Sequence, residues 1–225
     1  CEVNVRMRLR NLVLLVLAPV LLSALPLAGA DTPIHELQGT GASSPFAGQS
    51  VTTTGVVTAL RTSGFYLQGP DSEVDADPAT SEGVFVFTSS APPSAAAVGN
   101  RVRVTGTVVE YRPSADPASP PLTEIGGGPF VAFLSSGNPL PAPVLLASAD
   151  LSPAGPFDRL ERYEGMRVRV PALLVVAPTG GTFDEATATG RSNGVLVGVL
   201  QGVPRPFREA GADPLTPLPA GSPCC

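Results

Sequence analysis

The amino-acid sequence predicts an all-β protein in which a small barrel of five to six strands precedes a second, partial β unit. Glycine and proline make up 50 of the 225 residues and stand between short apolar runs, as turn residues do. Several of these runs alternate apolar and polar residues, which is the pattern of a strand with one wet face. Helical periodicity is weak, and residues 157–163 offer one or two helical turns at most.

Three similar segments carry the strongest strand signal, each a glycine turn followed by alternating residues. They begin at Gly48, Gly99 and Gly165. In the second segment Val102 and Val104 point to one face, so we expect each segment to form a half-buried strand. Gly55 and Gly106 stand inside the first two runs, where a small closed barrel needs bends or bulges.

Shorter strands are predicted between these segments, at residues 34–38, 64–68, 84–87, 122–125 and 129–134. Five strands, with the long ones bent at glycines, are what an OB-fold barrel requires. The predicted organisation is a leader over 1–30, an OB-fold-like barrel over 31–135, a linker over 136–143, a partial β unit over 144–203 and a proline-rich tail over 204–225.

The first 30 residues have the order of a secretory signal peptide. A basic stretch at residues 7–11 precedes an apolar run that is broken by Pro19 and Pro26, and small residues end at Ala30. That run is too short and too broken for a membrane-spanning helix. We expect cleavage near Ala30–Asp31 and a secreted product, extracellular or periplasmic, without a membrane anchor.

The expected mature chain is acidic and has few cysteines. Without Glu2 and three leader arginines, eleven arginines stand against eighteen acids, a net charge of −7. Polyanion binding needs clustered cations, so a nucleic-acid role would depend on a local arginine patch. Cys224 and Cys225 are adjacent at the end, which fits a truncated chain, a strained vicinal disulfide or an intermolecular bridge.

Several phrases of the sequence occur in the order found in one known family. They are IHELQGTG, GQSVTTTGVVTAL, GFYLQGPD, DADPATSEGVFVF and VGNRVRVTGTVVEY, and later ERYEGMRVRVPALLVV and GVPRPFREAG. This order resembles the N-terminal OB-fold-like region of secreted bacterial nucleases of the endonuclease/exonuclease/phosphatase (DNase I-like) family. One departure is Gly69, where the family has an acid.

The resemblance implies a parent protein that is an extracellular endonuclease. The catalytic domain of that family, with its divalent metal, follows this region, so no catalytic residue is assigned and this chain alone is expected to be inactive. It would be a non-catalytic accessory region that positions single-stranded or extracellular DNA, or that docks on its own nuclease domain. The alternative is a secreted structural or protein-interaction β module without a nucleic-acid role.

Six residues are candidates for nucleic-acid contact on one barrel face. They are Arg61, Phe65, Tyr66, Arg101, Arg103 and Arg112. OB-folds bind single strands by stacking bases on aromatic side chains within a cationic groove. In the alternative, Phe65 belongs to the core, Tyr66 to its rim, and the arginines to an ordinary wet face.

An acidic loop supplies the candidate ligands for Ca²⁺, the one cofactor considered for this chain. The acids are Asp71, Glu73, Asp75, Asp77 and Glu82. Alternate carboxylates can converge on a hard cation. The EF-hand spacing is half met, since Ala76 replaces its glycine while Glu82 stands at its last position, and a solvated acidic loop is the alternative. His35, beside Glu36, is expected to be a strand histidine with a polar neighbour.

Overall fold

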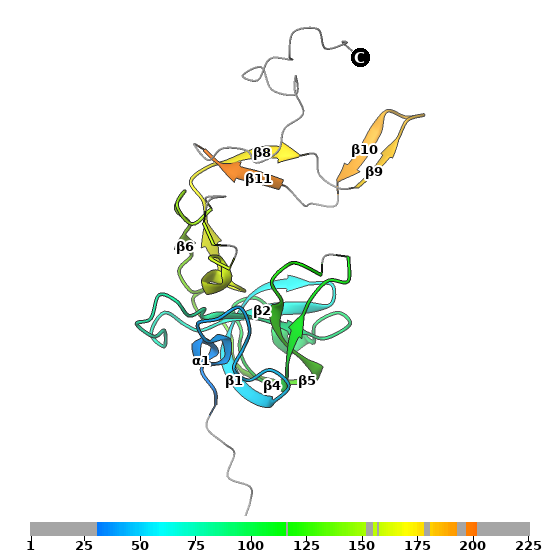
Figure 1. The fold of residues 1–225 in the computed structure, drawn as a ribbon. Helices are drawn as coiled ribbons and strands as arrows, with labels where there is room; N and C mark the ends of the chain where they lie inside the picture. Colours follow the sequence, from blue (N-terminus) through cyan, green and yellow to red (C-terminus); the bar gives the residue numbers. More distant parts are fainter. Residues whose placement is uncertain are drawn as a thin grey trace, which may run out of the picture.

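The computed structural model describes residues 31–115, 117–151, 155–156, 158–177, 181–192 and 197–201. These residues are mostly β: five strands form a mixed sheet that closes in a ring, and three two-stranded pairs follow it (Figure 1). The predicted leader over 1–30, the tail over 204–225 and the pair Cys224–Cys225 lie outside the described residues.

The ring confirms the predicted small closed β unit with five strands rather than six. Its strands are β1 (Ser50–Arg61), β2 (Gly64–Gln68), β3 (Gly83–Phe87), β4 (Arg101–Tyr111) and β5 (Leu122–Ser135). The order is β1-β2-β3-β5-β4, with β4 returning to pair with β1. All neighbours are antiparallel except β3 and β5, which are parallel.

The last strand corrects the sequence prediction of two strands at 122–125 and 129–134. β5 is one strand of 14 residues that runs through Gly126, Gly127 and Gly128. Gly127 and Gly128 have φ values of 72° and 76°, which side-chain-bearing residues rarely adopt. The β4–β5 register shifts opposite them, between Thr105 and Thr107, so the glycines form a bulge and do not end the strand.

Gly106 lies in the same shifted stretch of β4, where the two strands approach closely. A Cβ at this position would lie 2.6 Å from Ile125 Cγ2 and 2.9 Å from the Gly126 oxygen. The predicted role of this mid-strand glycine, a bulge in a small closed sheet, is therefore confirmed.

A hydrophobic core fills the ring and extends into short segments that cover its ends. Apolar side chains from all five strands meet there, together with Ile34, Leu37 and Ala96. Ala96 comes from the 3-10 turn η1 (Ser94–Ala96), and Ile34 and Leu37 come from the helix α1 (Ile34–Gln38).

The helix α1 replaces the strand predicted at 34–38. Pro33 precedes it, Gly39 ends it at φ 70°, and the Leu37 N–H bonds the Pro33 oxygen at 3.0 Å. Its buried residues are Ile34, Leu37 and Gln38, which is helical spacing and not strand spacing. His35 therefore lies on a helix.

The residues after the ring form three small pairs. They are β6 (Val144–Leu145) with β7 (Val168–Arg169), β8 (Leu173–Ala177) with β11 (Val197–Leu200), and β9 (Gly181–Asp184) with β10 (Thr189–Ser192). The prediction of one long half-buried strand from Gly165 on to Val176 is therefore wrong: this segment divides into the two exposed residues of β7 and the separate strand β8. The turn predicted at 157–163 is the 3-10 turn η2 (Glu161–Tyr163).

The segment around Gly165 packs directly on the ring. A Cβ on Gly83 would lie 2.3 Å from the Gly165 carbonyl carbon, so two glycine backbones touch here. Ser81 Oγ donates to the Glu164 oxygen at 2.6 Å, and the Arg167 N–H donates to Gln68 Oε1 at 2.8 Å. Part of the predicted second unit thus lies on the ring, at the ends of β2 and β3.

Candidate functional sites

The outer surface of β2 and β3 brings together aromatic residues and an arginine. We call Arg61, Tyr66, Phe85 and Phe87 the β2–β3 face. Arg61, Gly64 and Phe87 pair across three strands in one row, and Tyr66 and Phe85 pair in the next. The rings of Tyr66 and Phe85 lie 5.1 Å apart at 52°. Arg61 Nη1 donates to the Tyr66 hydroxyl at 3.4 Å, which sets a cation beside an aromatic ring.

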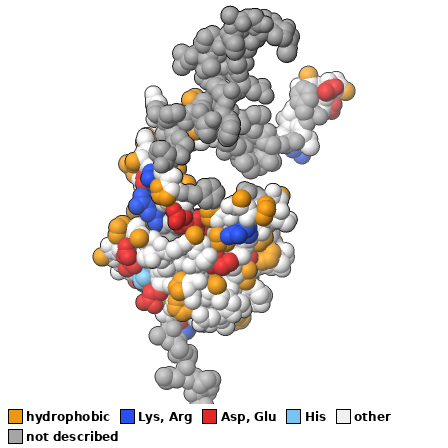
Figure 2. All heavy atoms as spheres, viewed as in Figure 1, with side chains coloured by type: hydrophobic (Ala, Val, Ile, Leu, Met, Phe, Trp, Pro, Cys, Tyr) orange, Lys and Arg blue, Asp and Glu red, His pale blue; other side chains and the backbone are white. Residues whose placement is uncertain are grey.

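The same face continues over β5 and β4 to the loop between them. Glu124 is paired with Phe85 and Val109, and burial raises the pKa of its carboxyl. Tyr111, two residues beyond Val109, is exposed, as is Arg112 at the start of the loop. Hydrophobic and basic side chains lie next to each other on the side of the ring seen in Figure 2.

The remaining residues predicted for nucleic-acid contact lie elsewhere. Phe65 is fully buried in the core, so its grouping with Tyr66 is corrected: neighbouring strand residues point to opposite faces. Arg101 is paired with Glu73 at 2.7 Å, and Arg103 with Asp31 at 2.5 Å. Of the six residues, Arg61, Tyr66 and Arg112 therefore lie at the β2–β3 face or its adjoining loop.

The five acids of the loop between β2 and β3 bond different partners. Asp71 accepts the Ala142 N–H at 3.0 Å, Glu73 pairs with Arg101, and Asp77 accepts the Ala79 N–H at 2.9 Å. Asp75 accepts Thr80 Oγ1 at 3.0 Å, and Glu82 accepts the Asp75 N–H at 2.8 Å. Calcium binding by this loop stays a prediction.

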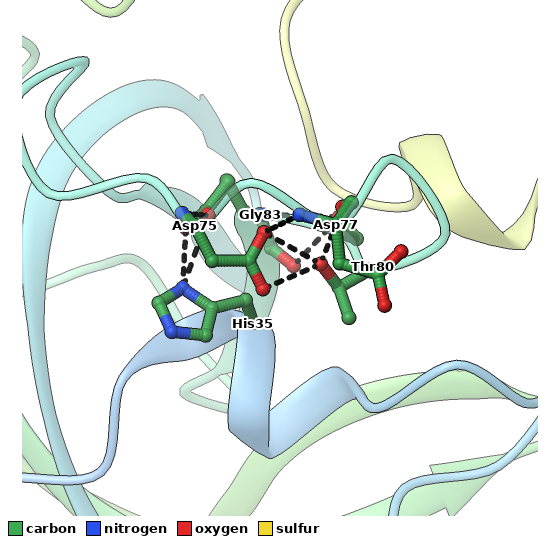
Figure 3. A network of polar contacts seen from close by, with 7 residues as sticks. His35, Asp75, Asp77, Thr80 and Gly83 are labelled. Atoms are coloured by element: carbon green, nitrogen blue, oxygen red, sulfur yellow. Dashed lines mark hydrogen bonds and ion pairs between the residues drawn. The ribbon is translucent and has the colours of Figure 1, made fainter.

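His35 joins two of these acids in a compact cluster (Figure 3). Its Nδ1 lies 3.0 and 3.2 Å from the two carboxylate oxygens of Glu82. One ligand atom from each of His35, Asp75 and Glu82 lies within 4.8 Å of the other two. No local pattern predicts this contact, because His35 and Glu82 are 47 positions apart.

Carboxyl groups also gather where the 158–167 segment meets the ring. The Thr123 N–H and Gln38 Nε2 donate to Glu164 Oε1 at 2.9 and 3.4 Å. Burial, and then the neighbouring Glu161, raise the pKa of Glu164 to about 8. Burial also raises the pKa of Glu161, and Glu110 raises both values further.

Sequence reasoning missed Phe87, Tyr111 and Phe130 as exposed aromatic residues. Phe130 on β5 is 70% exposed, and Phe133 and Leu134 are exposed near it in sequence. Strand alternation would have separated Phe87 from Val86, as it would have separated Phe65 from Tyr66. No local sequence pattern predicts that the carboxyl groups of Glu110 and Glu164 lie close together, since they come from distant parts of the chain.

Comparison with known proteins gives no relative. No protein-family model matches the chain, and no curated protein or solved structure matches it significantly. Within the part of the chain that the structure describes, no helix has the length and apolar character needed to cross a membrane.

Proposed function

We propose that this chain is the non-catalytic accessory region of an exported nuclease, and that its ring is an OB-fold barrel that holds single-stranded nucleic acid. The observation that carries the proposal is the β2–β3 face, where Tyr66, Phe87 and Arg61 lie together on the outside of the ring.

The strand arrangement supports the OB-fold assignment. An OB-fold is a five-stranded Greek-key barrel that binds oligonucleotides on strands 2 and 3, between the loop joining strands 1 and 2 and the loop joining strands 4 and 5. Here the ring has five strands, and β5 lies between β3 and β4. Arg61 ends β1 at the first loop, and Arg112 begins the second.

The chemistry of the face suits a single strand more than a duplex. Bases stack on aromatic side chains, and arginines contact phosphates or stack in turn. Tyr66 is half-buried with Arg61 at its hydroxyl, and Phe87 and Tyr111 are exposed. Phosphate contact at this face would rest on Arg61 and on Arg112 at the start of the adjoining loop.

The nuclease context rests on the resemblance of the quoted phrases to the N-terminal region of DNase I-like secreted nucleases. In that context the region positions the substrate, and hydrolysis belongs to a domain outside this chain. The export signal read in residues 1–30 agrees with an extracellular substrate.

The test is binding of a fluorescent single-stranded oligonucleotide by the chain from Asp31 at low salt. We expect binding that weakens as salt rises, because released counterions drive phosphate contacts. Tyr66→Ala and Arg61→Ala should weaken it, Tyr66→Ala by roughly 5- to 150-fold, since one stacked base contributes about 1–3 kcal/mol.

Arg103→Ala is the matched control, because Arg103 is paired with Asp31 away from the face. It should leave the affinity within about twofold. The proposal fails if no binding occurs at low salt, or if Arg103→Ala and Arg61→Ala weaken binding equally.

Exposed residues on β5 favour a second candidate, a protein-interaction module. Phe130 is 70% exposed, and Phe133 and Leu134 are also exposed. Exposed apolar surface of this kind marks protein contacts. For this candidate the chain should bind no oligonucleotide, and Phe130→Ser should abolish its association with a protein partner, measured by co-elution on a sizing column.

A further inference from the structure

His35 lies at the point where a helix, a loop and the beginning of a strand meet. It belongs to α1, Asp75 to the loop after β2, and Glu82 directly precedes β3. The side chains of His35 and Glu82 are 15% and 8% exposed. A histidine and a carboxylate thus face each other in a largely covered position, and a second carboxylate lies beside them.

The backbone fixes the position of Glu82. The Glu82 oxygen accepts the Gly69 N–H at 2.9 Å, and its carboxylate accepts the Asp75 N–H at 2.8 Å. These bonds hold the two ends of the loop together. Asp75 is oriented in turn by Thr80 Oγ1, which donates to both of its carboxylate oxygens.

One side of the cluster opens into a pocket of about 390 Å³. His35 and Glu82 line it, together with Asp31, Thr54, Gly69 and Glu73. The carboxylates of Asp31 and Glu73 are engaged by Arg103 and Arg101. The pocket therefore offers an entry path and room for a solvent ligand beside His35.

We propose that His35 Nδ1 and the carboxylates of Asp75 and Glu82 bind a divalent transition metal ion, with Zn²⁺ the best match. Zinc takes histidine nitrogen and carboxylate oxygen at about 2.0–2.2 Å, and an open zinc site has three protein ligands and one exchangeable position. Two such ligands on one tetrahedral ion lie about 3.3 Å apart, close to the 3.0 and 3.2 Å between His35 and Glu82.

The nitrogen ligand sets this site apart from the calcium loop predicted from sequence. Calcium takes oxygen ligands, six to eight of them, whereas imidazole suits zinc, copper and nickel. Binding requires the Asp75 carboxylate to turn from Thr80 toward His35, and requires the imidazole to be neutral.

The test is titration of the full-length chain with Zn²⁺ in a calorimeter at pH 7.5. The protein carries a purification tag that contains no histidine. Serine replaces Cys1, Cys224 and Cys225, because thiolates also bind zinc. His35 is the only histidine of the sequence, so its imidazole resonances report the site directly by NMR. We expect one bound ion and a shift of these resonances.

His35→Gln and Asp75→Asn should each weaken zinc binding by more than the roughly 10- to 100-fold that loss of an outer-shell partner costs. Asp71→Asn and Asp77→Asn, in the same loop but outside the cluster, should change it little. Far-UV circular dichroism shows whether each variant folds, and Asp75→Asn gives the answer if His35→Gln does not fold.

An absence of zinc binding overturns the proposal, as does binding that both His35→Gln and Asp75→Asn leave intact. His35 and Glu82 would then form a hydrogen-bonded pair only. A preference for Ca²⁺ over Zn²⁺ would also overturn it and would favour the oxygen-only loop site.

Discussion

Thr53 is fully buried inside the ring, and its hydroxyl has no hydrogen-bond partner among the residues that the structure describes. Its neighbour Thr52 points outward, where its Oγ1 lies 2.9 Å from Thr105 Oγ1 on β4. Two adjacent threonines thus have opposite surroundings, because successive strand residues point to opposite faces. A buried hydroxyl without a partner costs about 1–3 kcal/mol relative to a satisfied one.

We therefore expect Thr53→Val to raise the free energy of unfolding by roughly 1 kcal/mol, since valine has nearly the same shape and no polar group to bury. Thr52→Val, one residue away, should be neutral or mildly destabilising because it removes a bond on a wetter face. Urea denaturation of both variants measures the difference. A destabilised Thr53→Val would show that its hydroxyl is bonded in solution.

At this scale the sequence predicted side-chain placement only in part. Tyr66 and Arg61 were grouped correctly, because a short hairpin joins their strands. Phe65 was placed with them although alternation puts it on the other face. The meetings of His35 with Glu82, and of Glu164 with Thr123, depend on long-range packing that no local pattern contains.

Among the elements, α1 shows why a five-residue prediction can fail. Alternation over IHELQ cannot be told from the start of a helix in so short a run. Pro33 before it and Gly39 after it are the usual boundaries of a helix, and the buried pair Ile34 and Leu37 is three residues apart. β1 and β4 were predictable because their alternation extends over more residues, whereas the glycines inside β5 led to the prediction of two strands there.

The 3-10 turn η2 and the segment after it attach to the ring through Glu164, and this attachment should depend on pH. The pKa of Glu164 is about 8 in the folded chain, against an ordinary value of 4.5. Below pH 4.5 the carboxyl is protonated in both states. As pH rises toward 8, the unfolded chain loses this proton first, so the stabilising contribution is lost as pH passes through 8.

Glu164→Gln should remove this dependence, since glutamine keeps the carbonyl that accepts the Thr123 N–H and carries no charge. The free energy of unfolding of this variant, relative to that of the natural protein, should rise between pH 5 and pH 9 by an amount on the order of a few kcal/mol. Urea denaturation at each pH measures it. Glu36→Gln, at an exposed position of α1, is the control. Equal pH profiles for Glu164→Gln and the natural chain would contradict the expectation.

For the whole molecule, the structure ties residues 158–169 to the ring more closely than the predicted linker at 136–143 suggested. Gly165 touches Gly83, Arg167 bonds Gln68, and Glu164 bonds Ser81 and Thr123. The composition of the linker predicts a domain boundary, and β5 ends at Ser135 before β6 begins at Val144. The composition could not indicate that the chain returns to the ring afterwards.

A chain ending at residue 143 should therefore melt below one ending at residue 171, while a chain ending at residue 201 should match the latter. The shorter chain loses the hydrogen bonds that Gln68 and Thr123 make to this segment, and each such loss costs about 1 kcal/mol. One kcal/mol corresponds to about 4–8 °C for a domain of 60–100 residues. Melting curves followed by circular dichroism give the three midpoints. Identical midpoints for the chains that end at residues 143 and 171 would refute this expectation.

The parallel pairing of β3 with β5 has a consequence for how the chain is made. β3 ends at Phe87, yet the strand that covers its second edge arrives only with residues 122–135, after β4. A growing chain that has released four strands still exposes the edges of β3 and β4, and open edges invite pairing with other chains. Any ribosome, channel or chaperone that retains β5 keeps the ring open, so its closure is timed by the release of one late strand.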